Sequence, residues 1–394
     1  MRVLQVAPFP PERDGIATYT EMLCAELRRQ GHDVSVLASH RSDPPPSEVA
    51  GVLGGALASP AALAERVRGL APDVAHLQFA VATYGPRLLF VLRLLGQLRR
   101  MGIPVVVTMH EVTRDVETLG PVGRRAYRAL AARADRVIVH TEPARTAYVR
   151  HLPEGPSVEV VAHPRARLPP SPVSVEQLRR RHGLSSERIV LSFGFIHVDK
   201  GLDDLLHATA RLERERALDD VRVVLAGEVR RREGVQRPFE LRDRRYLRRL
   251  KAIVAQERIG HRVHFTGYVP ASEVRAWFEA ASLAVLPYRR IEQSGAGSLA
   301  SGAGTPLLTT TVGELAQMST LQPVPPEDPD ALADGLRRAL ADGNGDAARS
   351  ARGATRTARG AARGAPRPAP ATELPEVVRR TTRVYERVLE ERAA

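Results

Sequence analysis

The chain has 394 residues, 43% of them hydrophobic and 26% charged, a composition typical of a soluble globular protein with room for two domains. Its net charge of +13 favours an anionic partner, such as a phosphate-bearing substrate, a nucleic acid or an acidic membrane surface. Cys24 is the single cysteine, which excludes an intramolecular disulfide and any zinc site built on cysteines.

The first half of the chain alternates short β-branched runs with helical patterns. Residues 2–8 and 32–39 predict strands on either side of a helix over 16–31. Cys24 lies in the apolar pattern of that helix, where we interpret it as a buried structural thiol, and the proline-rich segment 43–47 is expected to be a loop. Four further strands are expected in the stretches PDVAHLQ, IPVVVTMH, ADRVIVHT and PSVEVVAHP. This alternation predicts a parallel sheet with helices on both faces.

A proline-rich segment, 164–174, is typical of a linker, and a second strand–helix alternation follows it. The sequence therefore predicts an α/β fold with two Rossmann-like domains, over residues 1–165 and 175–342. Residues 343–370 are a low-complexity segment of alanine, arginine and glycine, which we expect to be solvated. Helical periodicity returns in 371–394, which predicts a C-terminal helix that packs back on the N-terminal domain.

The start of the chain and its apolar stretches bear on location. The opening MRVLQVAPFPP is typical of a strand and not of a signal peptide. The longest apolar stretch, residues 88–98, is too short to span a bilayer and contains an arginine. We therefore predict a cytoplasmic protein.

In open parallel sheets, ligands bind beyond the carboxyl ends of the strands. His110 ends a predicted strand and is expected to present a free ring edge to the crevice, the alternative being a structural histidine with a satisfied ring. The structural interpretation is favoured for three other strand-end histidines: His76, His140 and His163. A small polar group follows the first strand: Asp14, Gly15 and Thr18. An ordinary helix N-cap explains Asp14 as well as a ligand does, and no spacing of histidines and acids predicts a metal site.

The second domain has two features of the same kind. Lys200 and Gly201 stand just before a helix, where a lysine and backbone N–H groups can neutralise a diphosphate, although a solvated lysine is the alternative. Residues 289–310, RRIEQSGAGSLASGAGTPLLTT, form a glycine-rich loop in this interpretation, directly after the strand LAVLPY. Glycines at this density let a backbone approach a phosphate or a sugar. We expect both features to border one cleft between the domains.

Five stretches, taken in order, suggest a family: DGIATYTEML, TMHE, GFIHVDKGLDDLLHA, HFTGYVPASEVRAWFEAASLAVLPY and EQSGAGSLASGAGTPLLTTTVG. Together they resemble the retaining GT-B glycosyltransferases of the family 4 type, over about residues 1–342 and the terminal helix. The resemblance implies two Rossmann-like domains facing a cleft, with a nucleoside diphosphate sugar on the C-terminal domain. UDP and GDP are the leading donors, and dTDP is a third. It also implies an acceptor on the N-terminal domain, retention of the anomeric configuration, and no cofactor or bound metal.

The resemblance also assigns roles to residues. Lys200 would hold the donor diphosphate, and His197 stands where a subgroup of the family has an arginine. As the catalytic residues, His110 would contact the transferred sugar or the leaving phosphate, and Glu292 would contact the sugar. The diphosphate or the acceptor would be approached by the residues after the first strand: Asp14, Gly15 and Thr18. Further donor-binding positions lie in the glycine-rich stretch: Gln293, Ser294, Gly295, Ala296 and Gly297.

The sequence departs from the family pattern at two places. The second glutamate of the family's glycine loop, which binds ribose, is replaced by Ala300 or by Leu299, depending on the alignment. The family's arginine before the lysine is Phe195 here. Two functions therefore stay open: an active transferase with other ribose contacts, or a catalytically weakened or inactive partner or regulatory protein. A transferase that moves a cyclitol in place of a sugar is a third.

Nucleic-acid binding through the basic segments is a further alternative. Residues 230–251 and 345–370 are rich in arginine. The second stretch has no aromatic residue and the first has only two, Phe239 and Tyr246, so neither has the repeated stacking element of single-strand binding. Residues 230–251 could instead meet an anionic acceptor or a membrane surface, the alternative being a solvated helix face. The acceptor, whether a small metabolite, a polysaccharide or a lipid intermediate, is not defined by the sequence.

Overall fold

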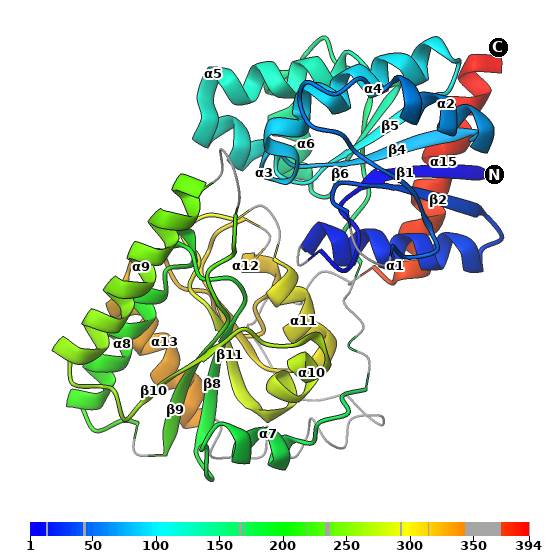
Figure 1. Ribbon diagram of the computed structural model, residues 1–394. Coiled ribbons are helices and arrows are strands. Elements are labelled where there is room, and N and C mark those ends of the chain that lie inside the picture. Colours follow the sequence, from blue (N-terminus) through cyan, green and yellow to red (C-terminus); the bar gives the residue numbers. More distant parts are fainter. Residues whose placement is uncertain are drawn as a thin grey trace, which may run out of the picture. The chain divides into compact units, whose positions relative to one another are not determined.

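The computed structural model describes residues 1–12, 15–41, 45–164, 168, 170–218, 220–232, 237–291, 294–313, 315–342 and 372–393. The chain forms two compact units (Figure 1). The first comprises Met1–Pro164 with Thr372–Ala394, and the second comprises Arg165–Ala371. Each contains one parallel sheet between layers of helices, which confirms the predicted α/β fold of two Rossmann-like domains. The low-complexity segment 343–370 lies outside the described residues.

The first unit is built on a seven-stranded sheet in the order β3-β2-β1-β4-β5-β6-β7. Its central strands are buried on both faces, as in β4, which has no exposed residue. The strands are β1 (Arg2–Ala7), β2 (Asp33–Ala38), β3 (Val49–Val52), β4 (Val74–Phe79), β5 (Val105–Met109), β6 (Arg136–Val139) and β7 (Val158–Val160). Strand β3 was not predicted, because this short edge strand is only partly buried and has no alternating pattern.

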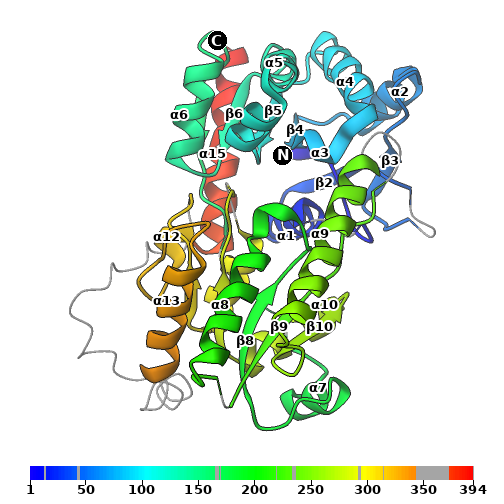
Figure 2. The same cartoon turned by 90° about the vertical axis from the view of Figure 1, so that its left-hand side faces the viewer.

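Helices cover both faces of this sheet. They are α1 (Gly15–Arg29), α2 (Ala61–Leu70), α3 (Val81–Tyr84), η1 (Gly85–Arg87), α4 (Leu88–Arg100), α5 (Val112–Ala131), α6 (Glu142–His151) and α15 (Leu374–Ala393). Helix α15 belongs to this unit and packs against α1 (Figure 2). Its Val377 and Tyr385 share a buried apolar cluster with Leu23 and Cys24 of α1. Cys24 is a buried free thiol whose pKa is raised by desolvation to about 12.

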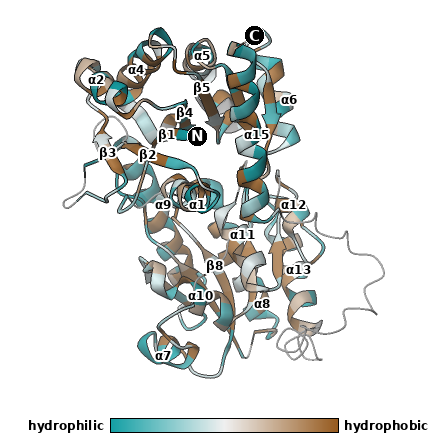
Figure 3. Ribbon diagram, turned by 90° about the vertical axis from the view of Figure 1, so that its right-hand side faces the viewer, coloured by the Kyte–Doolittle hydropathy of each residue, from teal (hydrophilic) through white to brown (hydrophobic). Residues whose placement is uncertain are grey.

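The second unit has a five-stranded sheet in the order β10-β9-β8-β11-β12. Its strands are β8 (Arg188–Phe193), β9 (Val221–Ala226), β10 (Val263–Gly267), β11 (Ala281–Leu286) and β12 (Leu307–Thr309). Its helices are α7 (Val175–Arg181), η2 (Val198–Lys200), α8 (Leu202–Arg214), α9 (Arg237–Gln256), α10 (Ala271–Ala280), α11 (Gly295–Ala303), α12 (Leu315–Met318) and α13 (Pro329–Asp342). In both units the strands are the most hydrophobic elements and the outer helix faces the most hydrophilic (Figure 3).

Glycines bring the carboxyl ends of three central strands of the second sheet close together. A Cβ at Gly227, after β9, would lie 2.0 Å from the carbonyl oxygen of Gly194, after β8. A Cβ at Gly201 would lie 2.0 Å from the carbonyl oxygen of Pro287, after β11, and Gly201 also has a φ of +58°. Only glycine fits at either position, so the loops after β8, β9 and β11 pack directly on one another.

The apolar stretch 88–98 lies in helix α4, which buries one face under the first sheet and exposes Leu89. Within the described ranges, no helix combines the length and the hydrophobicity needed to cross a membrane.

Candidate functional site

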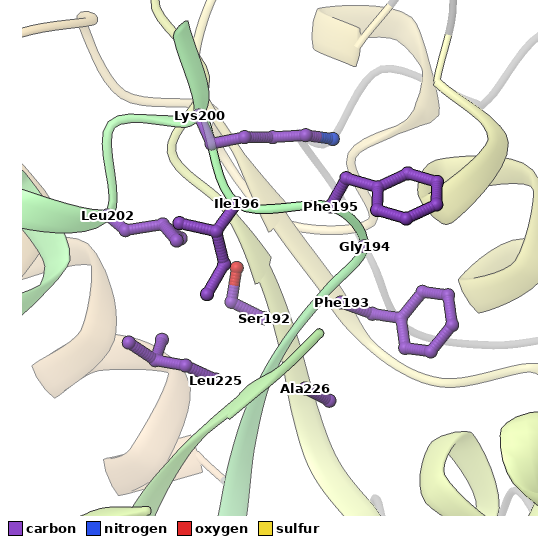
Figure 4. Close-up of a pocket in the computed structure, with 9 residues that line it drawn as sticks. All are labelled: Ser192, Phe193, Gly194, Phe195, Ile196, Lys200, Leu202, Leu225 and Ala226. Carbon is purple, nitrogen blue, oxygen red and sulfur yellow. The ribbon is translucent and has the colours of Figure 1, made fainter. Parts of the chain in front are cut away.

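The loop after β8 forms the wall of a small pocket in the second unit (Figure 4). The pocket holds about 200 Å³ of empty space, part of it open to solvent. Its lining comes from the ends of β8 and β9, the loop between β8 and α8, and the start of α8: Ser192, Phe193, Gly194, Phe195, Ile196, Lys200, Leu202, Leu225 and Ala226. The pocket therefore lies at the carboxyl ends of parallel strands, the position at which ligands bind in such sheets.

Lys200 is the cation of this pocket, and its side chain is held by Tyr288. The ammonium nitrogen lies 3.7 Å from the centre of the Tyr288 ring and also contacts the Tyr288 hydroxyl. Tyr288 is buried, and desolvation raises the pKa of its hydroxyl, so the ring stays neutral. The ring face attracts a cation, which makes this contact favourable. Figure 4 shows Lys200 and Phe195 extending to the same side of the loop.

Two buried carboxylates and one arginine fix the loop after β11 next to Lys200. Arg289 lies 2.7 Å from Asp204 and 3.0 Å from Asp203, both buried in the first turn of α8. The backbone N–H of Arg289 also donates to the Asp199 carbonyl oxygen over 2.8 Å. Desolvation raises the pKa of Asp204, and the hydrogen bond from Arg289 opposes that rise. This ion cluster was missed at the sequence level, where the pairs Asp203-Asp204 and Arg289-Arg290 were its only signal.

His197 and Phe195 occupy the loop before Lys200. His197 lies 3.6 Å from the Asp199 carboxylate. The guanidinium of Arg230, from the segment after β9, lies 5.7 Å from the centre of the Phe195 ring. A guanidinium from another strand end therefore lies near the ring of Phe195, the residue that stands where the resemblance implies an arginine.

Helix α11 occupies nine residues, Gly295–Ala303, in the middle of the stretch predicted to be a glycine-rich loop, so the prediction of a loop is wrong there. Ser294 caps α11, and its hydroxyl accepts from the Gly297 N–H over 3.0 Å. The Gly297 amide predicted to line a ligand pocket is thus used within the cap. A Cβ at Gly297 would lie 3.1 Å from the Met318 side chain, so this glycine serves helix packing. The N–H groups of Gly295 and Ala296, at the start of α11, have no acceptor among the described residues.

Two positions of the predicted site in this segment, Glu292 and Gln293, lie outside the described residues. The side chains that replace the second glutamate face the core. Ala300 is fully buried, and Leu299 packs against the same apolar cluster. Neither residue offers a polar group to a ribose.

In the first unit, His110 follows β5 and is buried. Its Nε2 lies 2.9 Å from Gln78 Oε1, and its Nδ1 lies 3.2 Å from His140 Nε2. The prediction of a free ring edge is therefore wrong, because both ring nitrogens have partners inside the unit. Desolvation lowers the pKa of His110 well below its usual value, and the neighbouring histidines lower it further.

The other strand-end histidines surround His110 or lie deeper in the sheet. His140 Nδ1 lies 2.8 Å from the Val161 carbonyl oxygen, and desolvation lowers the His140 pKa to about 3. His163 packs edge-on against His140, with ring centres 5.5 Å apart. His76 is within β4, and its nitrogens contact Tyr385 and Thr108 over 2.6 and 2.7 Å. His76 and His140 are buried, and His163 is partly buried, with its Nδ1 3.1 Å from the Pro164 carbonyl oxygen. All three are bonded, as structural histidines should be.

The start of α1 contains the remaining predicted residues. Asp14 lies outside the described residues, whereas Gly15 begins the helix. A Cβ at Gly15 would meet nothing within 4 Å, so packing does not require glycine there. Thr18 is exposed on the same helix. Over the part of the chain that the structure describes, no cluster of three or more histidines, cysteines or acids is arranged to bind a metal.

The second unit thus brings Lys200, His197 and the start of α11 to one end of its sheet. In the first unit, His110 directly follows β5, and Gly15 and Thr18 lie at the start of α1, the helix after β1.

Both units match described families. Residues 13–164 match the family described as Glycosyltransferase Family 4, and residues 187–342 match the family described as Glycosyl transferases group 1. The chain is 26% identical over 320 residues to the GDP-mannose-dependent alpha-(1-6)-phosphatidylinositol monomannoside mannosyltransferase of Mycolicibacterium smegmatis, over 75% of this chain and 74% of that protein. It is 29% identical over 233 residues to the D-inositol 3-phosphate glycosyltransferase of Streptomyces scabiei, over 55% of this chain and 49% of that protein.

Solved structures share the fold. Sucrose-phosphate synthase from Thermosynechococcus elongatus aligns with a TM-score of 0.70 at 17% identity, over 99% of this chain and 100% of that one. Anabaena HepE in complex with UDP-glucose aligns with a TM-score of 0.71 at 14% identity, over 98% of this chain and 100% of that one. At such identities the likeness shows the fold alone, which is that of the GT-B glycosyltransferases.

Proposed function

We propose that this chain, which belongs to the glycosyltransferases of family 4 and group 1, transfers a sugar from a nucleoside diphosphate to an acceptor hydroxyl with retention of configuration. The position of Lys200 supports a nucleoside diphosphate donor most directly. Lys200 lines the pocket after β8, and its ammonium lies on the ring face of Tyr288. In this proposal the reaction is cytoplasmic and requires no cofactor or bound metal.

The proposed reaction requires stabilisation of the negative charge on the departing phosphate and does not require a protein base. The bond between the anomeric carbon and the β-phosphate oxygen breaks, and the acceptor oxygen bonds to the same face of that carbon. The acceptor proton passes to the departing phosphate. Lys200 and the amides of Gly295 and Ala296 stabilise the charge that builds on this phosphate, because a cation and a helix N-terminus both favour an anion.

The sugar and acceptor contacts follow the family resemblance. His110 and Glu292 contact the transferred sugar, and a sugar hydroxyl takes over the ring nitrogen of His110 that Gln78 occupies. His197, Gln293 and the α11 cap complete the donor side. The acceptor or the diphosphate approaches the residues before and within the first turn of α1: Asp14, Gly15 and Thr18.

The nucleotide is UDP or GDP in this proposal. One relative is named as GDP-mannose-dependent, and HepE was solved with UDP-glucose. The missing ribose glutamate would cost about 1–3 kcal/mol of donor affinity if nothing replaced it. Arg230, beside Phe195, offers a guanidinium to the donor phosphates and offsets part of that loss.

The acceptor class in this proposal is anionic. Two relatives are named for a phosphatidylinositol monomannoside and for D-inositol 3-phosphate, both of which contain a phosphate. The outer face of α9 is basic, with Arg245, Arg248 and Lys251 exposed and Phe239 and Leu241 exposed near its start. A basic helix with exposed apolar residues suits peripheral contact with an anionic lipid surface. Vesicle flotation with and without anionic lipid tests this contact, and R245E/R248E/K251E should remove it.

Calorimetric titration with UDP, GDP, ADP and dTDP, and then with their sugar conjugates, tests the proposed donor. We expect saturable binding of UDP or GDP that is unchanged by EDTA, and loss of that binding in Lys200→Ala with an unchanged melting temperature. Arg290→Ala is a matched control beside the same loop. Absence of binding by every nucleotide at millimolar concentration would overturn the proposed donor.

Turnover assays and nucleic-acid titrations on the same variants separate the remaining alternatives. A weakened or inactive partner would bind a nucleotide sugar without hydrolysing or transferring it. A cyclitol transferase would bind the nucleotide but turn over only a nucleotide-linked cyclitol. A nucleic-acid-binding protein would bind DNA or RNA with a steep salt dependence that survives Lys200→Ala.

A further inference from the structure

A chain of buried hydrogen bonds runs through the sheet of the first unit and includes His110. From Val161, it passes through His140, His110, Gln78, Gln5, Tyr385 and His76 to Thr108. These side chains come from β1, β4, β5, the ends of β5 and β6, and helix α15, and every one of them is buried. Only the contact from Gln5 to Tyr385, at 3.4 Å, is long. Buried polar groups need partners, so the direction of each bond constrains the next.

The hydrogen bonds of this chain can run in one of two directions. In one of them, neutral His110 and His140 have too few protons to make every bond. The Val161 carbonyl only accepts, so His140 must donate from Nδ1 and, when neutral, has a lone pair on Nε2. If the Gln78 carbonyl faces His110, then His110 must donate from Nε2 and has a lone pair on Nδ1. Two lone pairs then face each other over 3.2 Å. That direction is satisfied only if the pair shares an extra proton and becomes a cation.

The opposite direction needs no extra proton. With the Gln78 amide turned by half a rotation, its N–H donates to His110 Nε2, and His110 donates from Nδ1 to His140. The Gln5 amide turns as well, so that its N–H donates to the Gln78 carbonyl. The Gln5 carbonyl then accepts from Tyr385, which accepts from His76, while Thr108 donates to His76. Each bond of this chain now joins one donor and one acceptor, and His110 and His140 both stay neutral. The Gln78 atom that faces the His76 ring, 3.4 Å from Nδ1 and 3.3 Å from Nε2, becomes the carbonyl oxygen and accepts from the Nδ1–H.

The surroundings favour the neutral direction. The groups that face the pair are Tyr19 of α1, with ring centres 5.3 Å from His110 and 5.5 Å from His140, and His163 after β7. Farther along the chain lie His76 and Tyr385. None of these groups is acidic, and neighbouring histidines oppose a positive charge. Desolvation lowers the pKa of His110 and that of His140, so an added proton has no stabilising partner.

We propose that Gln78 and His140 are positioning residues that hold His110 as the neutral Nδ1–H tautomer, with the Gln78 amide donating to Nε2. The catalytic consequence rests on the proposed function. A neutral His110 accepts a hydrogen bond from a sugar hydroxyl at Nε2 in exchange for Gln78, and it supplies no charge to the departing phosphate. Of His110 and Lys200, only Lys200 then carries a positive charge that can stabilise that phosphate.

Long-range ¹H–¹⁵N correlation spectra of the full chain, labelled with ¹⁵N-histidine, read the tautomer directly. His110→Gln and His140→Gln assign the two spin systems. We expect both rings to be protonated at Nδ1 and bare at Nε2, with no titration between about pH 5 and 8. Protonation of His110 at Nε2, or an imidazolium at neutral pH, would overturn the proposal. This result does not depend on any activity.

Substitution of Gln78 gives the second test. In Gln78→Glu the carboxylate can only accept, so His110 must donate from Nε2 and the pair should take up a proton near neutral pH. Gln78→Met removes both the donor and the charge, and should leave the pair neutral. Tyr385→Phe removes the hydroxyl at the far end of the chain and should leave His110 neutral as well. An unchanged His110 spectrum in Gln78→Glu, with the introduced carboxyl shown to be ionised by its ¹³C chemical shift, would contradict the proposal.

Turnover separates this proposal from the function on which it rests. If the chain transfers a sugar, Gln78→Glu should lower kcat by about 10- to 100-fold, by analogy with partners that orient metal-binding histidines, with little change in donor KM. In Gln78→Glu, kcat should also depend on pH near neutrality, whereas in Gln78→Met it should not. If the Nδ1–H tautomer is found but no nucleotide binds, the proposed function fails and the positioning stands. If a nucleotide binds but His110 is a different tautomer, the proposed function stands and the proposed positioning of His110 fails.

Discussion

The ammonium of Lys200 lies 3.7 Å from the centre of the Tyr288 ring and contacts the hydroxyl of the same side chain. Lys200 ends the short turn after β8, whereas Tyr288 follows β11, the neighbouring strand in the sheet. The Tyr288 carbonyl oxygen also accepts from the Thr310 hydroxyl over 2.6 Å, which ties the tyrosine to the end of β12. A flexible lysine is thereby restricted to one position before any ligand arrives, which lowers the entropy lost on binding.

Tyr288 should therefore set donor affinity without touching the donor. Tyr288→Phe keeps the ring face and loses the hydroxyl, so the nucleotide Kd should rise only about 2- to 5-fold. Tyr288→Leu loses both contacts and should raise the Kd by about 10-fold or more. Calorimetric titration measures both. Tyr148→Phe, which removes a hydroxyl bonded to the Pro156 carbonyl in the first unit, is the matched control and should leave the Kd unchanged.

Arg230 should contribute to donor binding because its guanidinium lies beside Phe195, in the lining of the same pocket as Lys200. Arg230→Ala should weaken binding of the nucleoside diphosphate by about 10-fold, whereas the nucleoside alone should bind as before. The adjacent and exposed Arg231 provides a control, Arg231→Ala, with the same change of charge. Equal losses in the two variants would mean that only general electrostatic attraction is involved.

Arg289 should be required for the stability of the second unit. Arg289→Gln removes the cation from the buried Asp204 carboxylate and leaves Asp203 paired with Arg249, 3.4 Å away. This should lower the free energy of unfolding by about 3–5 kcal/mol. Desolvation already raises the Asp204 pKa, and loss of Arg289 raises it further, so the folded protein then binds more protons than the unfolded chain. The deficit should therefore shrink as the pH falls from about 7 to 5.

Chemical denaturation of the Arg289→Gln variant at several pH values measures this deficit. Adding Asp204→Asn removes the buried charge and should restore part of the stability at neutral pH. A double variant no more stable than Arg289→Gln would show that the ion pair is not the source of the loss.

The buried histidines of the first unit predict loss of stability in acid. Desolvation lowers the pKa of His76 and of His140 to about 3, whereas an unfolded histidine titrates near 6.5. Below about pH 6.5 the unfolded chain thus binds more protons, and the free energy of unfolding falls towards pH 3. The limiting slope is about 1.4 kcal/mol per pH unit for each histidine.

Denaturant unfolding of the chain at several pH values below 7 measures this slope. His76→Gln should reduce it by the share of one histidine and keep a polar group beside Tyr385. His151→Gln, at the end of α6 and only partly buried, is the control and should leave the slope nearly unchanged. An equal slope in wild type and His76→Gln would contradict the burial of a neutral His76.

Much of the fold could be predicted from local patterns. Stretches such as VRVVLA in β9 are short, β-branched and buried on both faces, so their type follows from composition alone. Strand β3 could not be predicted, because its pairing with β2 depends on the sheet edge and not on its own four residues. The helix α11 was mistaken for a loop because glycine and serine have low helix propensity, while capping by Ser294 and packing against Met318 overcome it.

The amino-acid sequence by itself determined the two-domain α/β architecture, the family and the place of Lys200 before a helix, because these depend on periodicity and on residues adjacent in the chain. Tertiary structure alone decided the partners: Tyr288 for Lys200, Arg289 for Asp203 and Asp204, Gln78 and His140 for His110. Parallel strands that neighbour one another in a sheet come from distant parts of the chain. The side chains at their carboxyl ends therefore meet only after the sheet has formed.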